Sequence, residues 1–171
     1  VVNFILKDCQ DAIDAPEFPE DQTGAQKGRV GKGVALAIKA KTLLYAASPL
    51  FNTETPYMSL GVNNNLICLG SSNHELWKQA ADAAKAVLDW AAANGHHLIT
   101  DQGVDKNYRY SWEVYDNPEI IFAEKAHGEI GTWDWPWSAI SPPNIYPGNR
   151  GQSGISPTLN FVKKYEKRDG T

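Results

Sequence analysis

Apolar residues recur along this chain at helical spacing in several segments, and long polar stretches separate these segments. The first segment places its apolar residues on one helix face, with the i, i+3, i+4, i+7 spacing of an amphipathic helix: Val2, Ile5, Leu6, Cys9 and Ile13. This helix is expected to end before Pro16 and Pro19, because proline cannot continue a helical turn. Residues 15–29 are polar and rich in turn formers, which predicts a loop.

A second helix is predicted from about Val30 to Ser48, where nearly every residue is Ala, Val, Ile, Leu or Lys. It stops before Pro49. Between Val34 and Ala47 the helix is apolar on most of its faces, and its alanines allow other helices to approach closely. We therefore expect it at the centre of a helical stack.

A third helix is expected to start at a capping box, Ser72-x-x-Glu75, and to end at Asn94-Gly95. Its predicted packing face consists of Trp77, Ala80, Ala81, Ala84, Val87, Leu88 and Ala91. A last helix is expected to open with Ser156 as N-cap and Pro157 at the first helical position, and to run toward Gly170.

The remaining segments are less regular. The short apolar runs 98–99 and 120–122 are either strands or buried loop anchors, and residues 128–154 combine Gly, Pro, Ser and Asn with aromatic side chains. The predicted fold is mainly α, a helical scaffold with long ordered loops and few short strands. We divide it into a helical part (1–95), a loop-rich aromatic part (96–155) and the start of a further helix (156–171).

Composition narrows the possible partners. The chain has 171 residues, 42% hydrophobic, with 16 Lys and Arg against 20 Asp and Glu. A net charge of −4 argues against nucleic acid as the main partner, and no apolar run is long enough to span a membrane. The chain begins at Val1 without a Met or a signal segment, so we expect it to be an excerpt of a longer protein.

Motifs for catalysis or cofactor binding are weak. The segment 28–33 resembles a phosphate-binding loop, but Gln26 stands where that loop needs Gly and Gly33 stands where it needs Ser or Thr. We interpret it as a glycine-rich helix start. Cys9 and Cys68 lack the spacing of a zinc site and are expected to be small buried apolar residues. We predict no enzyme activity, no metal and no cofactor.

The most informative segment is Trp133-Asp134-Trp135-Pro136-Trp137. Pro136 favours an extended backbone, in which residues i, i+2 and i+4 share a face and the indoles lie roughly 6–7 Å apart. Aromatic faces at that spacing can stack on sugar rings while polar neighbours bind hydroxyl groups. The alternative is that these Trp fill a core under a long loop. The predicted glycan-binding residues are Trp133, Asp134, Trp135, Trp137, Asn144 and Tyr146.

Residues 28–52 resemble the signature helix of the SusD/RagB family of outer-membrane nutrient-binding lipoproteins. Four further segments resemble family motifs in the same order: 4–13, 77–88, 117–122 and 156–170. One departure is Leu159, where the family usually has Gln. Family members are several times longer, so the resemblance implies that this chain is the central portion of such a protein.

The resemblance implies a fold of tetratricopeptide-like helix pairs and a location on the cell surface of a Gram-negative bacterium. It also implies a non-catalytic role: capture of an oligosaccharide or polysaccharide for a TonB-dependent, SusC-like barrel transporter, with a lipid anchor outside these residues. Three alternatives remain open: a helical-repeat protein–protein interaction module, the capture of a non-sugar nutrient, and an enzyme of the glycosidase type.

Overall fold

The described structure is helical. The computed structural model describes residues 1–26, 29–114, 116–123 and 157–165. Its helices are α1 (Val2–Asp14), the 3-10 helix η1 (Gly24–Gln26), α2 (Lys32–Ala47), the 3-10 helix η2 (Gly61–Leu66), α3 (Glu75–Ala93), α4 (Asn107–Glu113) and α6 (Leu159–Val162). The chain divides into two compact units, Val1–Glu124 and Lys125–Thr171, and α6 belongs to the second.

The predicted mainly α class is confirmed, but the expectation of short strands is wrong for the residues that the structure describes. Residues 98–99 and 120–122 have no regular structure. Ile99 is nonetheless buried, so the first run is a loop anchor. A run of two or three apolar residues is too short to distinguish these possibilities without the tertiary contacts.

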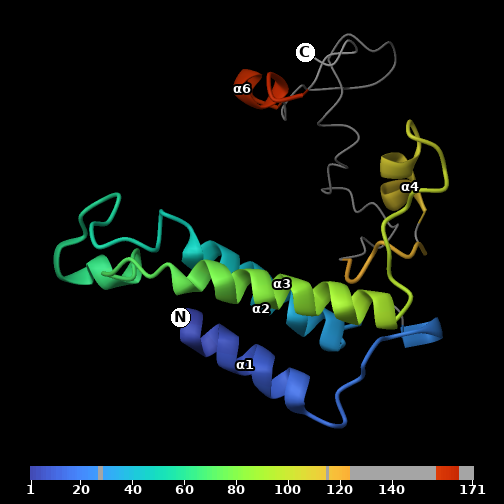
Figure 1. Ribbon diagram of the computed structural model, residues 1–171, viewed down its shortest axis with the longest axis horizontal. Helices are drawn as coiled ribbons and strands as arrows, with labels where there is room; N and C mark the ends of the chain where they lie inside the picture. The colour runs from blue at the N-terminus through green and yellow to red at the C-terminus, as the bar shows by residue number, and fades with distance from the viewer. Residues whose placement is uncertain (27–28, 115, 124–156, 166–171) are drawn as a thin grey trace, which may run out of the picture. The chain divides into compact units, whose positions relative to one another are not determined.

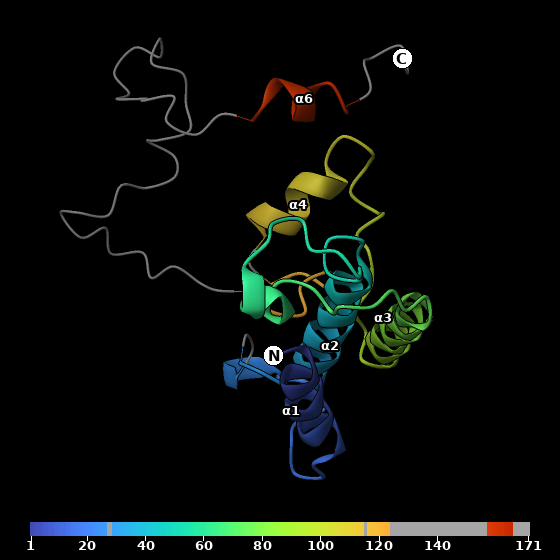
Figure 2. The ribbon, with the colours of Figure 1, turned by 90° about the vertical axis from the view of Figure 1, so that its left-hand side faces the viewer.

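Helix α2 packs against both α1 and α3, which confirms its predicted central position (Figures 1 and 2). Its buried positions are mostly small or aliphatic: Gly33, Val34, Ala35, Leu43, Ala46 and Ala47. Between α1 and α2, the Lys39 ammonium donates a hydrogen bond of 2.5 Å to the Gln10 side-chain oxygen. Small side chains on α2 thus let one helix contact neighbours on two sides.

The packing face of α3 is only partly the predicted one, in which Ala80 is buried as expected. Trp77 and Leu88 are 45% and 69% exposed, whereas Trp90, absent from the predicted face, is only 6% exposed. The indole of Trp90 lies over Gly33, so close that a Cβ at Gly33 would come within 2.2 Å of the ring. Gly33 in the glycine-rich helix start therefore leaves room for the Trp90 ring. This contact sets the rotation of α3 about its axis.

Both predicted N-cap residues, Ser72 and Ser156, are wrong. Ser72 makes no capping bond; the Asn73 side chain accepts one from the Glu75 backbone N–H at 3.0 Å. Thr158, rather than Ser156, caps α6, because its hydroxyl accepts a bond from the Phe161 N–H at 3.2 Å. In both cases two hydrogen-bonding residues stand within two positions of each other, and the start of the helical backbone decides which one caps.

The stop of α3 at Asn94-Gly95 is confirmed. Gly95 adopts φ +79, and the His96 N–H bonds the Ala91 carbonyl at 2.8 Å. This is the Schellman arrangement, which needs a left-handed residue where glycine carries no steric cost.

The long loop between α2 and α3 is held by one buried side chain. Asn52 is 9% exposed, and its amide nitrogen donates to the Asn73 carbonyl at 2.8 Å while its oxygen accepts from the Asn73 N–H at 2.7 Å. The Leu69 N–H also bonds the Phe51 carbonyl at 2.7 Å. Both ends of this loop are therefore joined, which makes it an ordered loop as predicted.

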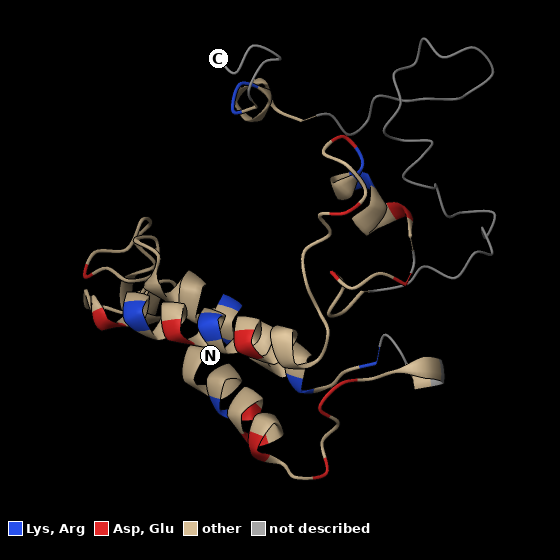
Figure 3. Ribbon diagram, turned by 45° about the vertical axis from the view of Figure 1, so that its right-hand side comes forward, with Lys and Arg blue, Asp and Glu red and all other residues tan. Residues whose placement is uncertain are grey.

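Charged residues alternate in sign along α3, whereas α1 carries one lysine followed by three aspartates (Figure 3). They form i, i+4 ion pairs: Lys7–Asp11, Lys78–Asp82, Lys85–Asp89 and Arg109–Glu113, the last on α4. The hydrogen bond to the acidic partner raises the pKa of Lys7, Lys78 and Arg109. Such exposed pairs add little stability and mainly keep these faces polar. Across the described residues, no helix combines the length and apolar character needed to cross a bilayer.

Candidate functional site

The six predicted glycan-binding residues all lie outside the described residues. They are Trp133, Asp134, Trp135, Trp137, Asn144 and Tyr146, and each belongs to the segment 124–156. The aromatic-row hypothesis therefore stays a prediction. The described structure contributes the scaffold and the chain that immediately precedes this segment.

Asn117 anchors that preceding chain. It is only 2% exposed, and its amide nitrogen donates to the carbonyls of Val114 at 2.7 Å and Ser111 at 3.1 Å. Its side-chain oxygen accepts from the Glu119 N–H at 3.0 Å. One buried side chain thus satisfies three backbone groups and ties residues 116–119 to the end of α4.

The same segment is also held by the chain that follows α3. The His97 N–H bonds the Pro118 carbonyl at 3.2 Å, and the Ile99 N–H bonds a Glu119 carboxylate oxygen at 3.2 Å. These contacts join residues 97–99 to residues 118–119 without forming a strand pair. The chain that leads into the aromatic segment is therefore held both by the end of α4 and by residues 97–99.

His96 and Trp90 form a stacked pair beside residues 116–119. Their ring centroids are 4.9 Å apart, and the indole N–H donates to the Glu20 carbonyl at 3.1 Å. The two imidazole nitrogens of His96 lie 3.0 Å from the Pro118 carbonyl and 3.4 Å from an Asp21 carboxylate oxygen. Both neighbours are acceptors, and the imidazole ring lies between them. This cluster joins three loops and is structural.

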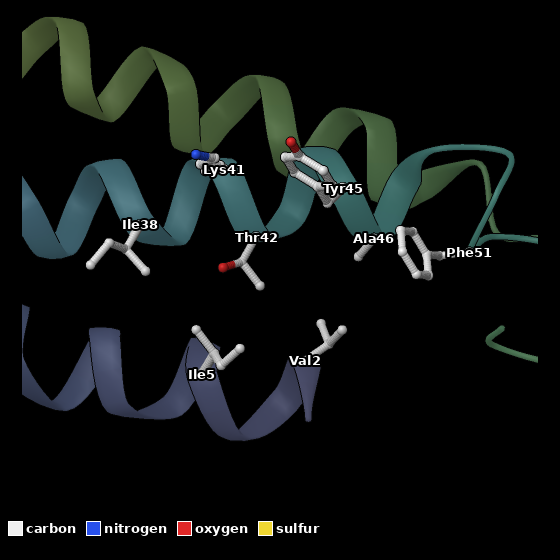
Figure 4. A pocket seen from close by; sticks show the side chains of 8 residues that line it. All are labelled: Val2, Ile5, Ile38, Lys41, Thr42, Tyr45, Ala46 and Phe51. Carbon is white, nitrogen blue, oxygen red and sulfur yellow. The ribbon is translucent and has the colours of Figure 1, made fainter. Parts of the chain in front are cut away.

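An open apolar groove of about 340 Å³ lies between α1 and α2 (Figure 4). Ile38, Thr42 and Ala46 point from α2 toward α1, where Val2 and Ile5 face them. The remaining lining residues are Lys41, Tyr45 and Phe51. The groove is in the volume range of small-molecule sites, but it has few polar groups to orient a ligand.

A second groove of about 280 Å³ lies between α2 and α3. Its lining is dominated by small side chains, with Leu44 and Trp77 as the large members: Ala40, Lys41, Leu44, Trp77, Ala80, Ala81 and Ala84. Lys41 is the residue common to both grooves, and it is their one charged lining residue.

The structure presents an aromatic pair that the sequence reasoning missed. Tyr108 and Trp112 are 75% and 76% exposed on α4, and their ring centroids lie 6.3 Å apart with an interplanar angle of 61°. The Arg109–Glu113 ion pair occupies the adjacent row of the same helix. The i, i+4 spacing of Tyr and Trp was the available signal, but only the fold shows that both rings face solvent.

This pair combines exposed aromatic rings with an adjacent guanidinium and carboxylate. Exposed aromatic faces stack on apolar C–H faces of pyranose rings, and guanidinium and carboxylate groups bind hydroxyl groups. In the part of the chain that the structure describes, no group of three or more His, Cys, Asp and Glu side chains is arranged to hold a metal.

Cys9 and Cys68 are free thiols and are buried, as predicted. Burial raises the pKa of the Cys9 thiol, and the adjacent Asp8 carboxylate raises it further. A raised thiol pKa lowers the thiolate fraction at neutral pH, so Cys9 lacks the character of a nucleophile.

No protein-family model matches this chain, and a search of curated proteins finds no match either.

Proposed function

We propose that this chain belongs to a non-catalytic, surface-exposed glycan-binding protein of the SusD/RagB type. In this proposal the protein captures an oligosaccharide or polysaccharide for a TonB-dependent, SusC-like transporter in the outer membrane. A lipid anchors the glycan-binding protein to the same membrane. The sequence resemblance in five ordered segments is its main support. The tetratricopeptide-like pairing of helices belongs to the same proposal.

The structural observation that best supports glycan binding is the Tyr108–Trp112 pair. Two large aromatic side chains that are three-quarters exposed on a seven-residue helix do not contribute to the described core. Adjoining exposed aromatic side chains form an apolar surface of the kind that ligands or partners cover. The predicted aromatic row at 133–137 follows in sequence after the anchored segment 116–119.

Calorimetric titration with soluble glycans tests the proposal. Maltoheptaose, cellohexaose, xylohexaose and laminarihexaose are titrated against the intact chain and against Trp112→Ala, Trp135→Ala and Trp137→Ala. Loss of one stacking ring should weaken binding about tenfold. Trp77→Ala, which removes a Trp from the groove between α2 and α3, should bind like the unsubstituted chain.

The outcomes separate the parts of the proposal. No binding of any of these glycans contradicts the glycan function. Binding that is unchanged in Trp135→Ala and Trp137→Ala contradicts the assignment of the aromatic row, and release of reducing sugar contradicts a non-catalytic role.

One observation favours the second candidate, a protein–protein interaction module. Helix α2 keeps large apolar side chains exposed although it packs against two helices. Under that function the Trp variants would still fold but would fail to copurify with a barrel transporter. Capture of a non-sugar nutrient is the third possibility, and binding of peptides instead of glycans in the same titrations would support it.

A further inference from the structure

Helix α4 carries the exposed aromatic pair but has little packing of its own. Within the residues that the structure describes, none of its seven side chains is buried, and it packs against no other helix. A helix of two turns is marginal in water unless tertiary contacts support it. The placement of Tyr108 and Trp112 therefore depends on the contacts that the neighbouring loops make with α4.

The two faces of α4 differ in burial. The inner face of the helix and its C-cap consists of half-buried residues at the spacing i, i+3, i+4 and i+7: Asn107, Tyr110, Ser111 and Val114. The outer face carries Tyr108 and Trp112. The described chain contacts α4 on its inner face, so the aromatic pair lies on the face directed away from those contacts.

The inner face is held by a buried amide. The Asn117 amide nitrogen donates to the carbonyls of Ser111 and Val114, at the end of the helix where carbonyls lack intrahelical partners. The Ser111 hydroxyl in turn donates to the Tyr108 carbonyl at 2.7 Å. A continuous set of hydrogen bonds thus runs from Asn117 to the first residue of the aromatic pair.

Asn117 is itself fixed by its surroundings. Its side-chain oxygen accepts from the Glu119 N–H, and residues 118–119 are bonded to residues 97–99. Because Asn117 is 2% exposed, a ligand on the outer face of α4 does not touch it. An effect of Asn117 on binding at that face is therefore transmitted through α4.

We propose that Asn117 is the positioning residue of the Tyr108–Trp112 pair, because its amide holds α4 in the conformation in which both rings meet a sugar. This inference rests on the proposed glycan function. A site that is ordered before the ligand arrives avoids the entropy cost of ordering on binding. Without the Asn117 amide, α4 would have to be ordered by the glycan, and this cost would lower the affinity.

The test replaces Asn117 by Asp in the intact 171-residue chain. This change keeps the acceptor for the Glu119 N–H and removes both donors to α4. Asn52→Asp is the matched control, since Asn52 is the other buried Asn of the described residues and bonds the backbone of Asn73 in the same two ways. The control makes the same chemical change in the loop between α2 and α3.

Hydrogen–deuterium exchange measures the order of α4 without any glycan. The amides to follow are those of Tyr110 and Val114, which bond the carbonyls of Lys106 and Tyr110. Asn117→Asp should speed their exchange about tenfold, because loss of two bonds makes local opening of α4 easier. Asn52→Asp should leave the exchange of these amides unchanged.

Calorimetry with maltoheptaose, cellohexaose, xylohexaose and laminarihexaose measures the effect on binding. Asn117→Asp should weaken the binding of those glycans that bind the unsubstituted chain by about tenfold, as for loss of a stacking ring. Once Tyr108 and Trp112 have both been replaced by Ala, the same change should alter affinity less than about twofold. In Trp135→Ala it should keep its full effect, which separates α4 from the predicted aromatic row. Asn52→Asp should leave affinity unchanged.

Three results would overturn the proposal. The first is unchanged exchange of the Tyr110 and Val114 amides in Asn117→Asp, whatever the glycans do. The second is faster exchange with unchanged affinity, and the third is an equal loss of affinity with and without the aromatic pair. If none of the four glycans binds the unsubstituted chain, the proposed function fails, and the exchange rates still decide whether Asn117 holds α4.

Discussion

Replacement of Gly33 by Ala tests the contact that positions α3 on α2. The new Cβ would lie 2.2, 2.4 and 2.6 Å from Cη2, Cζ2 and Cζ3 of Trp90. Ordinary van der Waals contact begins near 3.4 Å, so the ring must retreat by about 1 Å. The hydrogen bond from the indole to the Glu20 carbonyl and the stacking on His96 both oppose this movement.

The expected cost follows from these contacts. Overpacking of a filled site costs about 1–3 kcal/mol, and loss of the Trp90–Glu20 hydrogen bond adds about 1 kcal/mol. The higher helix propensity of Ala returns up to about 1 kcal/mol. We therefore expect Gly33→Ala to lower the free energy of unfolding by about 2 kcal/mol.

Urea unfolding followed by far-ultraviolet circular dichroism measures this cost without relying on Trp fluorescence. The control is a double-mutant cycle with Trp90→Phe, whose smaller ring leaves room for the Cβ. In the Trp90→Phe background, Gly33→Ala should cost less than about 1 kcal/mol. An equal cost in both backgrounds, or a cost below about 0.5 kcal/mol in the unsubstituted chain, would refute the reasoning.

Three further predictions concern single side chains. Asn52→Ala should lower the free energy of unfolding by about 2–3 kcal/mol in urea titration, because both backbone groups of Asn73 lose their bonds; no measurable loss would contradict this. Iodoacetamide should alkylate Cys9 more slowly than a model thiol at about pH 8, because a raised pKa lowers the thiolate fraction. Asp8→Asn should speed that reaction, as mass spectrometry would detect, and an unchanged rate would exclude the contribution of the carboxylate. Trp112→Ala should change the unfolding free energy by less than about 0.5 kcal/mol, since the ring is 76% exposed; a larger loss would reveal packing that the exposure does not indicate.

The candidate sites differ in whether a local sequence pattern or only the tertiary structure reveals them. The Trp133–Trp137 row was predicted from the spacing of an extended chain, a local property. The Tyr108–Trp112 pair was missed, because exposure of an aromatic residue depends on which other segments cover it. The grooves beside α2 were missed as well, since each is formed by residues of separate helices.

Sequence alone determined the features that depend on local spacing and backbone chemistry. These are the amphipathic first helix, the central alanine-rich second helix and the stop of α3 at Gly95. Periodicity and left-handed backbone preference act over a few residues, so both are readable from the chain. Burial of Cys9 and Cys68 was predictable because cysteine usually behaves as a small apolar residue.

Tertiary structure alone decided which face of α3 is buried and which lysine of α2 contacts α1. The alanines of α3 lie on several of its faces, so its sequence pattern does not single out the face that holds Trp90 over Gly33. Lys41 and Lys39 are equally basic in the sequence, but only Lys39 finds a side chain on α1. Both outcomes depend on contacts between residues far apart in the chain, and such contacts exist only after the helices have packed.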